Sequence, residues 1–148
     1  MGFDKELKNI VKKKDKNYAR TLALGLQWVS VGYSSALYFA GKKIGKEIVA
    51  AELKSSDVKG VFKEATQIFK NLGIGNLSVK TVEENRAVLV LKGGTTASKI
   101  APVGKTVCYF EAGMISGILE GRLKKSVTVT ETRCGGLGHP EEEFTVKM

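Results

Sequence analysis

The sequence predicts an α/β domain of the α+β type, in which an antiparallel sheet packs against helices. Residues 76–82 alternate as a strand, a polar turn follows, and residues 87–92 return as the antiparallel partner. Residues 58–72 and 107–123 repeat apolar side chains at helical steps, and two closing strands are expected at 127–131 and 144–146. The length of 148 residues suits one domain, so we expect a single domain over residues 1–148.

The N-terminal half is predicted to hold a lysine-rich arm and then a long helix. Residues 1–20 place apolar side chains at helical spacing, which favours a short amphipathic helix or arm, and the Lys12-Lys13-Lys14 run is expected to be a solvated face. Residues 22–31 look like a strand or an extended connection. The helix at 34–53 is expected to bury one face, made of Leu37, Tyr38, Ile44, Ile48 and Ala51.

Two local signals refine these helices. Gly41 and Gly45 lie one turn apart inside the helix at 34–53, where each glycine costs up to about 1 kcal/mol relative to alanine. Their presence predicts that another backbone packs closely there. Asp57 supplies a cap at the start of the helix at 58–72, and Gly73 is expected to end that helix.

The charge of the chain is strongly basic. It carries 24 basic against 15 acidic residues, a formal net charge of +9, and nearly all of the basic residues are lysine. Recognition of bases and phosphates draws on arginine, and no recognised nucleic-acid-binding motif accompanies the charge, so nucleic acid is not an expected partner. Contact with an acidic partner or an anionic surface stays open.

The segment from Thr21 to Gly41 contains no charged residue and reaches the length of a membrane span. Polar residues such as Gln27 interrupt it, and basic residues flank both ends, so we expect it to be core rather than a membrane helix. The apolar run begins after a charged segment, which disfavours a signal peptide. Two cysteines are then expected to be reduced thiols or metal ligands of a cytoplasmic protein.

Both cysteines fall near a third potential metal ligand. Cys108 opens a helix, and Glu131-x-x-Cys134 follows the next strand, so three donors could meet at one point. On spacing alone, two core thiols and a surface carboxylate are the commoner outcome. The glycines at 135–138 lack the register of a phosphate loop, and no nucleophile and base pair is evident.

The C-terminal third resembles the vinyl-4-reductase domain family, known in archaea and bacteria as hydrocarbon-binding proteins. The family pattern has a Cys that opens a Glu-Ala-Gly-x-x-x-Gly helix, then Glu-x-x-Cys, then Gly-Asp-Pro-x-Cys-x-Phe-x-Val. The matching positions are Cys108, Glu111, Ala112, Gly113, Gly117, Glu131, Cys134, Gly138, Pro140, Phe144 and Val146. Two positions depart, since Glu142 replaces the last cysteine and His139 replaces the aspartate.

The resemblance implies a zinc site and a fold similar to the ligand-binding domain of nitric-oxide sensors and transport-particle subunits. Cys108, Glu131 and Cys134 would be zinc ligands, with Glu142 as the fourth and His139 as its substitute. Two carboxylates among the ligands would hold zinc less firmly than sulfur, so occupancy could be partial. The family also implies a homodimer formed through the glycine-bearing helix.

The resemblance further implies an apolar cavity between helices and sheet. The expected lining is Trp28, Tyr38, Phe39, Phe62, Phe69, Phe110 and Met114, although for any single aromatic a place in a filled core is the commoner outcome. The expected function is non-enzymatic binding of an apolar or aromatic small molecule. Two alternatives stay open: an accessory role in reducing a vinyl group of a tetrapyrrole, and a scaffold subunit without a ligand.

Overall fold

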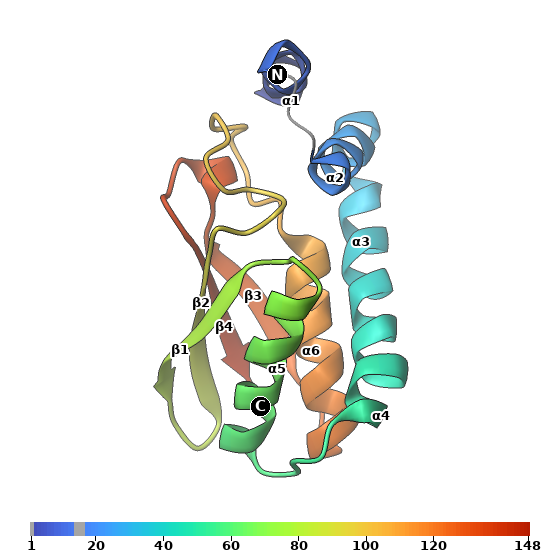
Figure 1. Cartoon of the computed structure of the whole chain (residues 1–148), viewed down its shortest axis with the longest axis vertical. Helices are drawn as coiled ribbons and strands as arrows, with labels where there is room; N and C mark the ends of the chain where they lie inside the picture. Colours follow the sequence, from blue (N-terminus) through green and yellow to red (C-terminus); the bar gives the residue numbers. More distant parts are fainter. Residues whose placement is uncertain (1, 14–16) are drawn as a thin grey trace.

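One four-stranded antiparallel sheet forms one side of the molecule, as the computed structural model shows (Figure 1). The structure describes residues 2–13 and 17–148. The strands are β1 (Asn76–Val82), β2 (Arg86–Lys92), β3 (Thr128–Arg133) and β4 (Glu142–Lys147), and their order in the sheet is β1-β2-β4-β3. The predicted α+β class and the predicted hairpin are confirmed.

Helices cover one face of this sheet in two layers. The helices of the described chain are α1 (Gly2–Lys13), α2 (Tyr18–Val29), α3 (Gly32–Lys43), the π-helical η1 (Ile44–Val49), α4 (Ala50–Glu52), α5 (Val58–Asn71) and α6 (Tyr109–Leu123), and a 3-10 turn η2 spans Gly135–Leu137. Helices α1 and α2 lie at one end of the molecule (Figure 1). Helices α5 and α6 pack on the sheet, and α3 and η1 pack on the outer side of α6 (Figure 1). The side chain of Asp57 accepts from the amide of Gly60, which confirms the predicted cap of α5.

Helix α6 lies between the sheet and the outer helices, so it is buried all round. Every residue from Glu111 to Leu119 is buried. Glycines bring α6 close to α3 and η1 from both sides. A Cβ on Gly113 of α6 would collide with the carbonyl of Tyr38, and a Cβ on Gly45 of η1 would lie 2.6 Å from the carbonyl of Met114. The close backbone approach predicted from the glycines is confirmed, and both partners belong to the same chain.

Two sequence predictions need correction. Residues 22–29 belong to helix α2 and are not extended, because Asn17 caps the helix by accepting from the amide of Arg20 at 2.9 Å, whereas Ser30 and Val31 follow the end of the helix. The prediction of a strand rested on the alternating leucines. In the helix these leucines do not share one environment, because Leu24 is fully buried whereas Leu22 is half exposed.

The helix predicted at 34–53 exists, but its buried face is not the predicted one. Ile44 and Ile48 are 40% and 63% exposed, whereas Gly41, Gly45 and Val49 are buried. The physical reason is that the glycines allow the closest approach to α6, so the large aliphatic side chains turn outward.

Helix α1 docks onto the loop that joins β2 to α6. Phe3 and Ile10 are buried, and Glu6 accepts from the amide of Ala101 at 3.1 Å. The N-terminal arm is therefore an amphipathic helix over residues 2–13, and Lys14 of the predicted lysine run lies outside the described residues. Within the part of the chain that the structure describes, none of the helices has the length and apolar content needed to cross a membrane.

Candidate functional site

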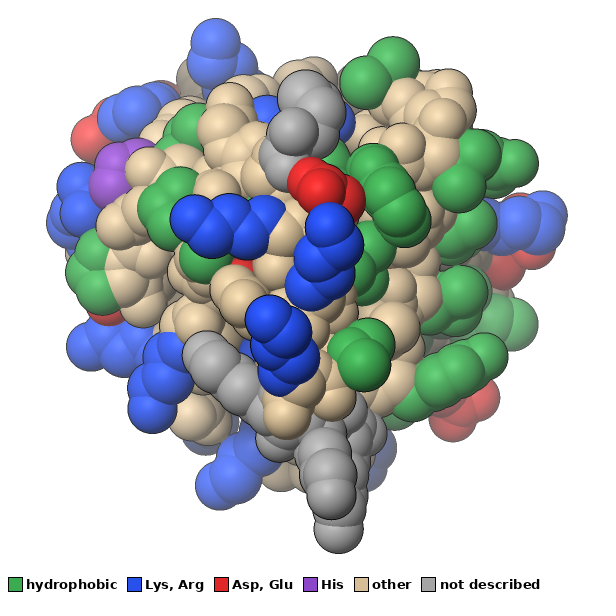
Figure 2. Space-filling view, turned by 90° about the horizontal axis from the view of Figure 1, so that it is seen from above, with side chains coloured by type: hydrophobic (Ala, Val, Ile, Leu, Met, Phe, Trp, Pro, Cys, Tyr) green, Lys and Arg blue, Asp and Glu red, His purple; other side chains and the backbone are tan. Residues whose placement is uncertain are grey.

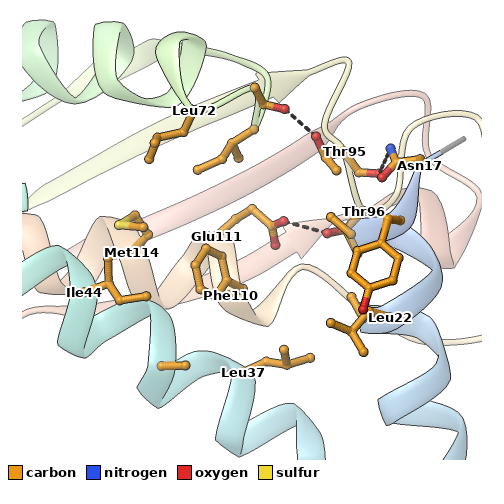
Figure 3. A pocket seen from close by; sticks show the side chains of 16 residues that line it. Asn17, Leu22, Leu37, Ile44, Leu72, Thr95, Thr96, Phe110, Glu111 and Met114 are labelled. Carbon is orange, nitrogen blue, oxygen red and sulfur yellow. Dashed lines mark hydrogen bonds between the residues drawn. The ribbon is translucent and has the colours of Figure 1, made fainter.

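A cavity of about 990 Å³ lies between α2, α3, α6 and the loops that follow α5 and β2 (Figure 3). Met114 and Ile74 are buried in its wall, and the half-exposed side chains of Leu22, Ile44 and Leu72 lie at its rim. Most of the lining is apolar. Polar side chains gather where the loop after β2 meets the start of α6, as Figure 3 shows for Thr95, Thr96 and Glu111.

Helix α2 holds that loop in place through hydrogen bonds to its carbonyls. Arg20 donates to the carbonyls of Thr95 and Ser98 at 2.9 and 2.8 Å, and Asn17 donates to the carbonyl of Thr95 at 3.2 Å. The amide of Thr95 in turn donates to the carbonyl of Ile74 at 2.8 Å. One wall of the cavity is therefore fixed by contacts between segments far apart in the sequence.

The structure places only some of the predicted pocket residues at this cavity. Phe110 and Met114 line it. Tyr38 and Phe39 lie beside a smaller cavity of about 300 Å³ near Glu131. The remaining three lie elsewhere: Phe62 and Phe69 are buried in the core, and Trp28 is 54% exposed.

The cavity also has lining residues that the sequence did not suggest. Glu111 and Thr96 are the most polar of the buried ones. Glu111 was visible as part of the family pattern, but nothing in that pattern assigned it a role. The apolar residues Leu37 and Ala40 were hidden by the absence of any motif, because a cavity wall is assembled from separate elements.

A second feature lies next to this cavity, at the N-terminus of α6. The ligand atoms of Cys108, Glu131 and Cys134 all lie within 4.8 Å of one another, so the structure brings the predicted trio together. Cys108 is the residue before the first turn of α6, and its amide donates to Glu131 Oε2 at 3.0 Å. Cys134 precedes the η2 turn, and its Sγ accepts from the amide of Gly136 at 3.3 Å. This group is close enough to hold a metal ion.

Burial and hydrogen bonding separate the pKa values within this cluster. Burial raises the pKa of Cys108 well above its usual value, and burial together with the charge of Cys134 raises the pKa of Glu131 to about 10. Hydrogen bonds from Cys108 first, and then from Glu131 and the Gly136 amide, lower the pKa of Cys134 to about 6 although burial opposes them. Within the cluster, the pKa of Cys134 is therefore lowered, whereas the pKa values of Cys108 and Glu131 are raised.

Neither candidate for a fourth ligand belongs to this group of three, and the two candidates differ in the structure. His139 Nδ1 accepts from the amide of Cys134 at 3.0 Å, so this nitrogen supports the Cys134 backbone. Glu142 is 1% exposed, and both of its carboxylate oxygens are buried without a hydrogen-bond partner among the described residues. Burial, and then the charge of Cys134, raise the pKa of Glu142 to about 7.

Glu111 connects the cluster with the cavity. It lines the cavity from the first turn of α6, and Thr96 Oγ1 donates to its Oε1 at 2.7 Å. Burial, and then the charge of Cys134, raise the pKa of Glu111. Unpartnered oxygens also occur on Glu131 and Glu142 in the described chain, so this region has more acceptors than donors. Protons, a metal ion or a ligand could supply the missing partners.

Comparison with known proteins identifies the family. The sequence profile of the vinyl-4-reductase domain matches residues 88–148, which hold the whole Cys–Glu–Cys cluster. An uncharacterised protein of Methanocaldococcus jannaschii, MJ0150, is 36% identical over 129 residues, which cover 87% of this chain and 73% of that protein. The chain belongs to the vinyl-4-reductase domain family. The resemblance found in its C-terminal third is thereby confirmed.

Solved structures share the fold of this vinyl-4-reductase domain at low sequence identity. A vinyl-4-reductase family protein from Methanocaldococcus jannaschii superposes with a TM-score of 0.61 at 20% identity, covering 97% of this chain and 90% of the other. The phenol-responsive sensory domain of the transcription activator PoxR, solved with phenol, gives 0.59 at 17% identity, with coverages of 95% and 70%. Trafficking protein particle complex subunit 3 from Naegleria fowleri, covalently bound to palmitic acid, gives 0.59 at 19% identity, with coverages of 95% and 89%.

Proposed function

We propose that this vinyl-4-reductase domain binds an apolar or aromatic small molecule in the cavity between α2, α3 and α6. The observation that carries the proposal is the cavity itself, about 990 Å³ in volume with a mostly apolar lining. Pockets that enclose small molecules typically measure ~300–1,000 Å³ and combine apolar walls with a few polar groups. The shared fold of a sensory domain solved with phenol supports the same function.

Thermal unfolding with candidate ligands tests this proposal. A ligand that binds only the folded chain at a hundredfold excess over its Kd raises the free energy of unfolding by about 2.7 kcal/mol, enough to shift the midpoint measurably. A screen of phenols, fatty acids and tetrapyrroles should give at least one such shift, and native mass spectrometry should show the same compound bound.

A matched pair of variants locates the binding site. Met114 is 1% exposed in the cavity wall, so Met114→Trp should fill the space and abolish the shift. Val29 is 74% exposed and does not line the cavity, so Val29→Trp should leave the shift unchanged. If no compound in the screen shifts the midpoint of the unaltered chain, the proposed function is wrong.

We also propose that Cys108, Glu131 and Cys134 hold a structural zinc ion. Two thiols and a carboxyl with a buried, unpartnered Oε1 are a suitable donor set, and the ion would fasten the start of α6 to the end of β3. Glu142 is our proposed fourth ligand because its buried oxygens lack partners, whereas His139 Nδ1 is engaged with the backbone. Glu142→Ala should therefore weaken zinc binding more than His139→Ala, and the reverse ranking would favour the histidine.

A homodimer is the third part of the proposal. Apolar side chains gather on the right-hand side of Figure 2. The large apolar side chains that α2, α3, η1 and the turn between α2 and α3 expose include Trp28, Val29, Val31, Phe39 and Ile48. Exposed apolar surface of this kind is typical of protein interfaces. Light scattering after size-exclusion chromatography should report a dimer that Phe39→Lys dissociates and that Val82→Lys, on the sheet, leaves intact. A monomeric unaltered chain would contradict this part.

The same exposed surface favours one competing function, that of a scaffold subunit. The shared fold of a trafficking protein particle subunit is consistent with it. Under this alternative, a stable hetero-complex would form through α2 and α3, and no extractable small molecule would accompany the purified protein.

A further inference from the structure

Most polar groups of the cavity are already paired within the chain. Thr95 Oγ1 donates to the carbonyl of Gly73, and Asn17 Nδ2 donates to the carbonyl of Thr95. Thr96 Oγ1 donates to Glu111 Oε1 at 2.7 Å, as the dashed line in Figure 3 marks. These hydrogen bonds position the polar end of the cavity and use the hydroxyl protons of Thr95 and Thr96.

Glu111 Oε2 is the exception. Glu111 is 4% exposed, it lines the cavity, and Oε2 is buried without a hydrogen-bond partner. Among the cavity-lining residues, which all lie in the described chain, Glu111 alone has a buried side-chain nitrogen or oxygen in this state. An unpaired buried acceptor is costly, and a molecule that donates a hydrogen bond to it removes that cost.

We propose that Glu111 Oε2 accepts a hydrogen bond from the head group of the bound molecule, so that the cavity selects apolar molecules ending in a hydroxyl or amino group. This inference rests on the proposed ligand-binding function of the same cavity. It also disfavours a class: a ligand carboxylate has no proton to donate to Oε2, and it would add a negative charge near Cys134, whose charge already raises the pKa values of Glu111 and Glu142.

A series of compounds with one apolar body tests the head-group preference directly. The probes are 4-propylphenol, 4-propylaniline, 4-propylanisole, in which the hydroxyl is methylated, and 4-propylbenzoate. Titration calorimetry on the unaltered chain should show the phenol and the aniline binding about tenfold or more tightly than the anisole, because a hydrogen bond to a charged or strongly polar acceptor is worth at least this factor. The benzoate should bind most weakly.

Two matched variants then assign the preference to Glu111. In Glu111→Gln the Thr96 hydroxyl can keep donating to the amide oxygen, which turns the amide nitrogen, a donor, toward the cavity. The phenol-to-anisole preference should then fall below about threefold, and benzoate binding should increase. Glu6 is similarly buried, at 6% exposed, but does not line the cavity, so Glu6→Gln should keep the preference of the unaltered chain.

The possible outcomes separate this inference from the proposed function. If the compounds bind with similar affinity whatever their head group, the cavity does bind ligands and the role of Glu111 is overturned. If Glu111→Gln keeps the preference, or if benzoate binds the unaltered chain best, the role of Glu111 is likewise overturned. If none of the four compounds binds, this inference fails, whereas the proposed function fails only if the wider screen also gives no ligand. The measurements on the unaltered chain decide the matter even if a variant does not fold.

Discussion

The contact between α6 and the outer helix layer allows a sharp prediction about stability. A Cβ on Gly117 would collide with the carbonyl of Lys42 and lie 2.8 Å from the amide nitrogen of Lys46. Overpacking costs about 1–3 kcal/mol where side chains can adjust, and here the obstacle is backbone, so the upper end applies. The higher helix propensity of alanine relative to glycine offsets about 1 kcal/mol of this cost. We therefore expect Gly117→Ala to lower the free energy of unfolding by about 2 kcal/mol.

The matched control is Gly25, an interior glycine of α2. Apart from the neighbouring residues and the backbone of α2 itself, no atom of the described chain lies within 4 Å of a Cβ built on Gly25, so Gly25→Ala should raise the free energy of unfolding by about 0.5–1 kcal/mol. Urea unfolding followed by circular dichroism measures both, and the thermal midpoints should move in opposite directions by a few degrees. If Gly117→Ala were as stable as Gly25→Ala, the close approach of α6 to the outer layer would be refuted.

Three further predictions concern the metal, the pH dependence and a helix cap. We expect up to one zinc ion per chain to co-purify with the unaltered protein, and Cys134→Ser should abolish zinc binding because it removes one of two soft ligands. Metal analysis of both proteins measures this. A metal-free unaltered protein with titratable thiols would contradict the prediction. Hydrogen bonds from Ser55 and from backbone amides lower the pKa of Glu64 to about 2 from 4.5. A pKa that is lower in the folded than in the unfolded chain stabilises the folded chain at pH values above the unfolded pKa. This stabilisation should be lost as pH falls from about 4.5 toward 2, and the free energies of unfolding of Glu64→Gln and the unaltered chain should converge over that range. Asp57→Ala should cost about 1 kcal/mol in urea unfolding, whereas Ser56→Ala, at an exposed position beside it, should change little.

The local elements of this chain were largely readable from sequence because each depends on neighbouring residues. The hairpin follows from alternation around a polar turn, and helix α5 follows from its apolar period and the Asp57 cap. Helix α2 was missed because alternating leucines are compatible with either a strand or a helix. The cap at Asn17 and its anchorage by the loop after β2 decided between them.

The sequence by itself determined the α+β class, the family, and the grouping of Cys108, Glu131 and Cys134. The three residues could be grouped because each lies at or near the end of a helix or strand, and the order of these elements along the chain brings those ends together. Only the tertiary structure decided which apolar side chains enclose space and which turn to the surface. Trp28 and Met114 are both suitable cavity residues by type, yet one is 54% exposed and the other 1%. The physical reason is that a cavity is the volume left between helices whose approach is set by glycine contacts elsewhere, and no local pattern encodes that distance.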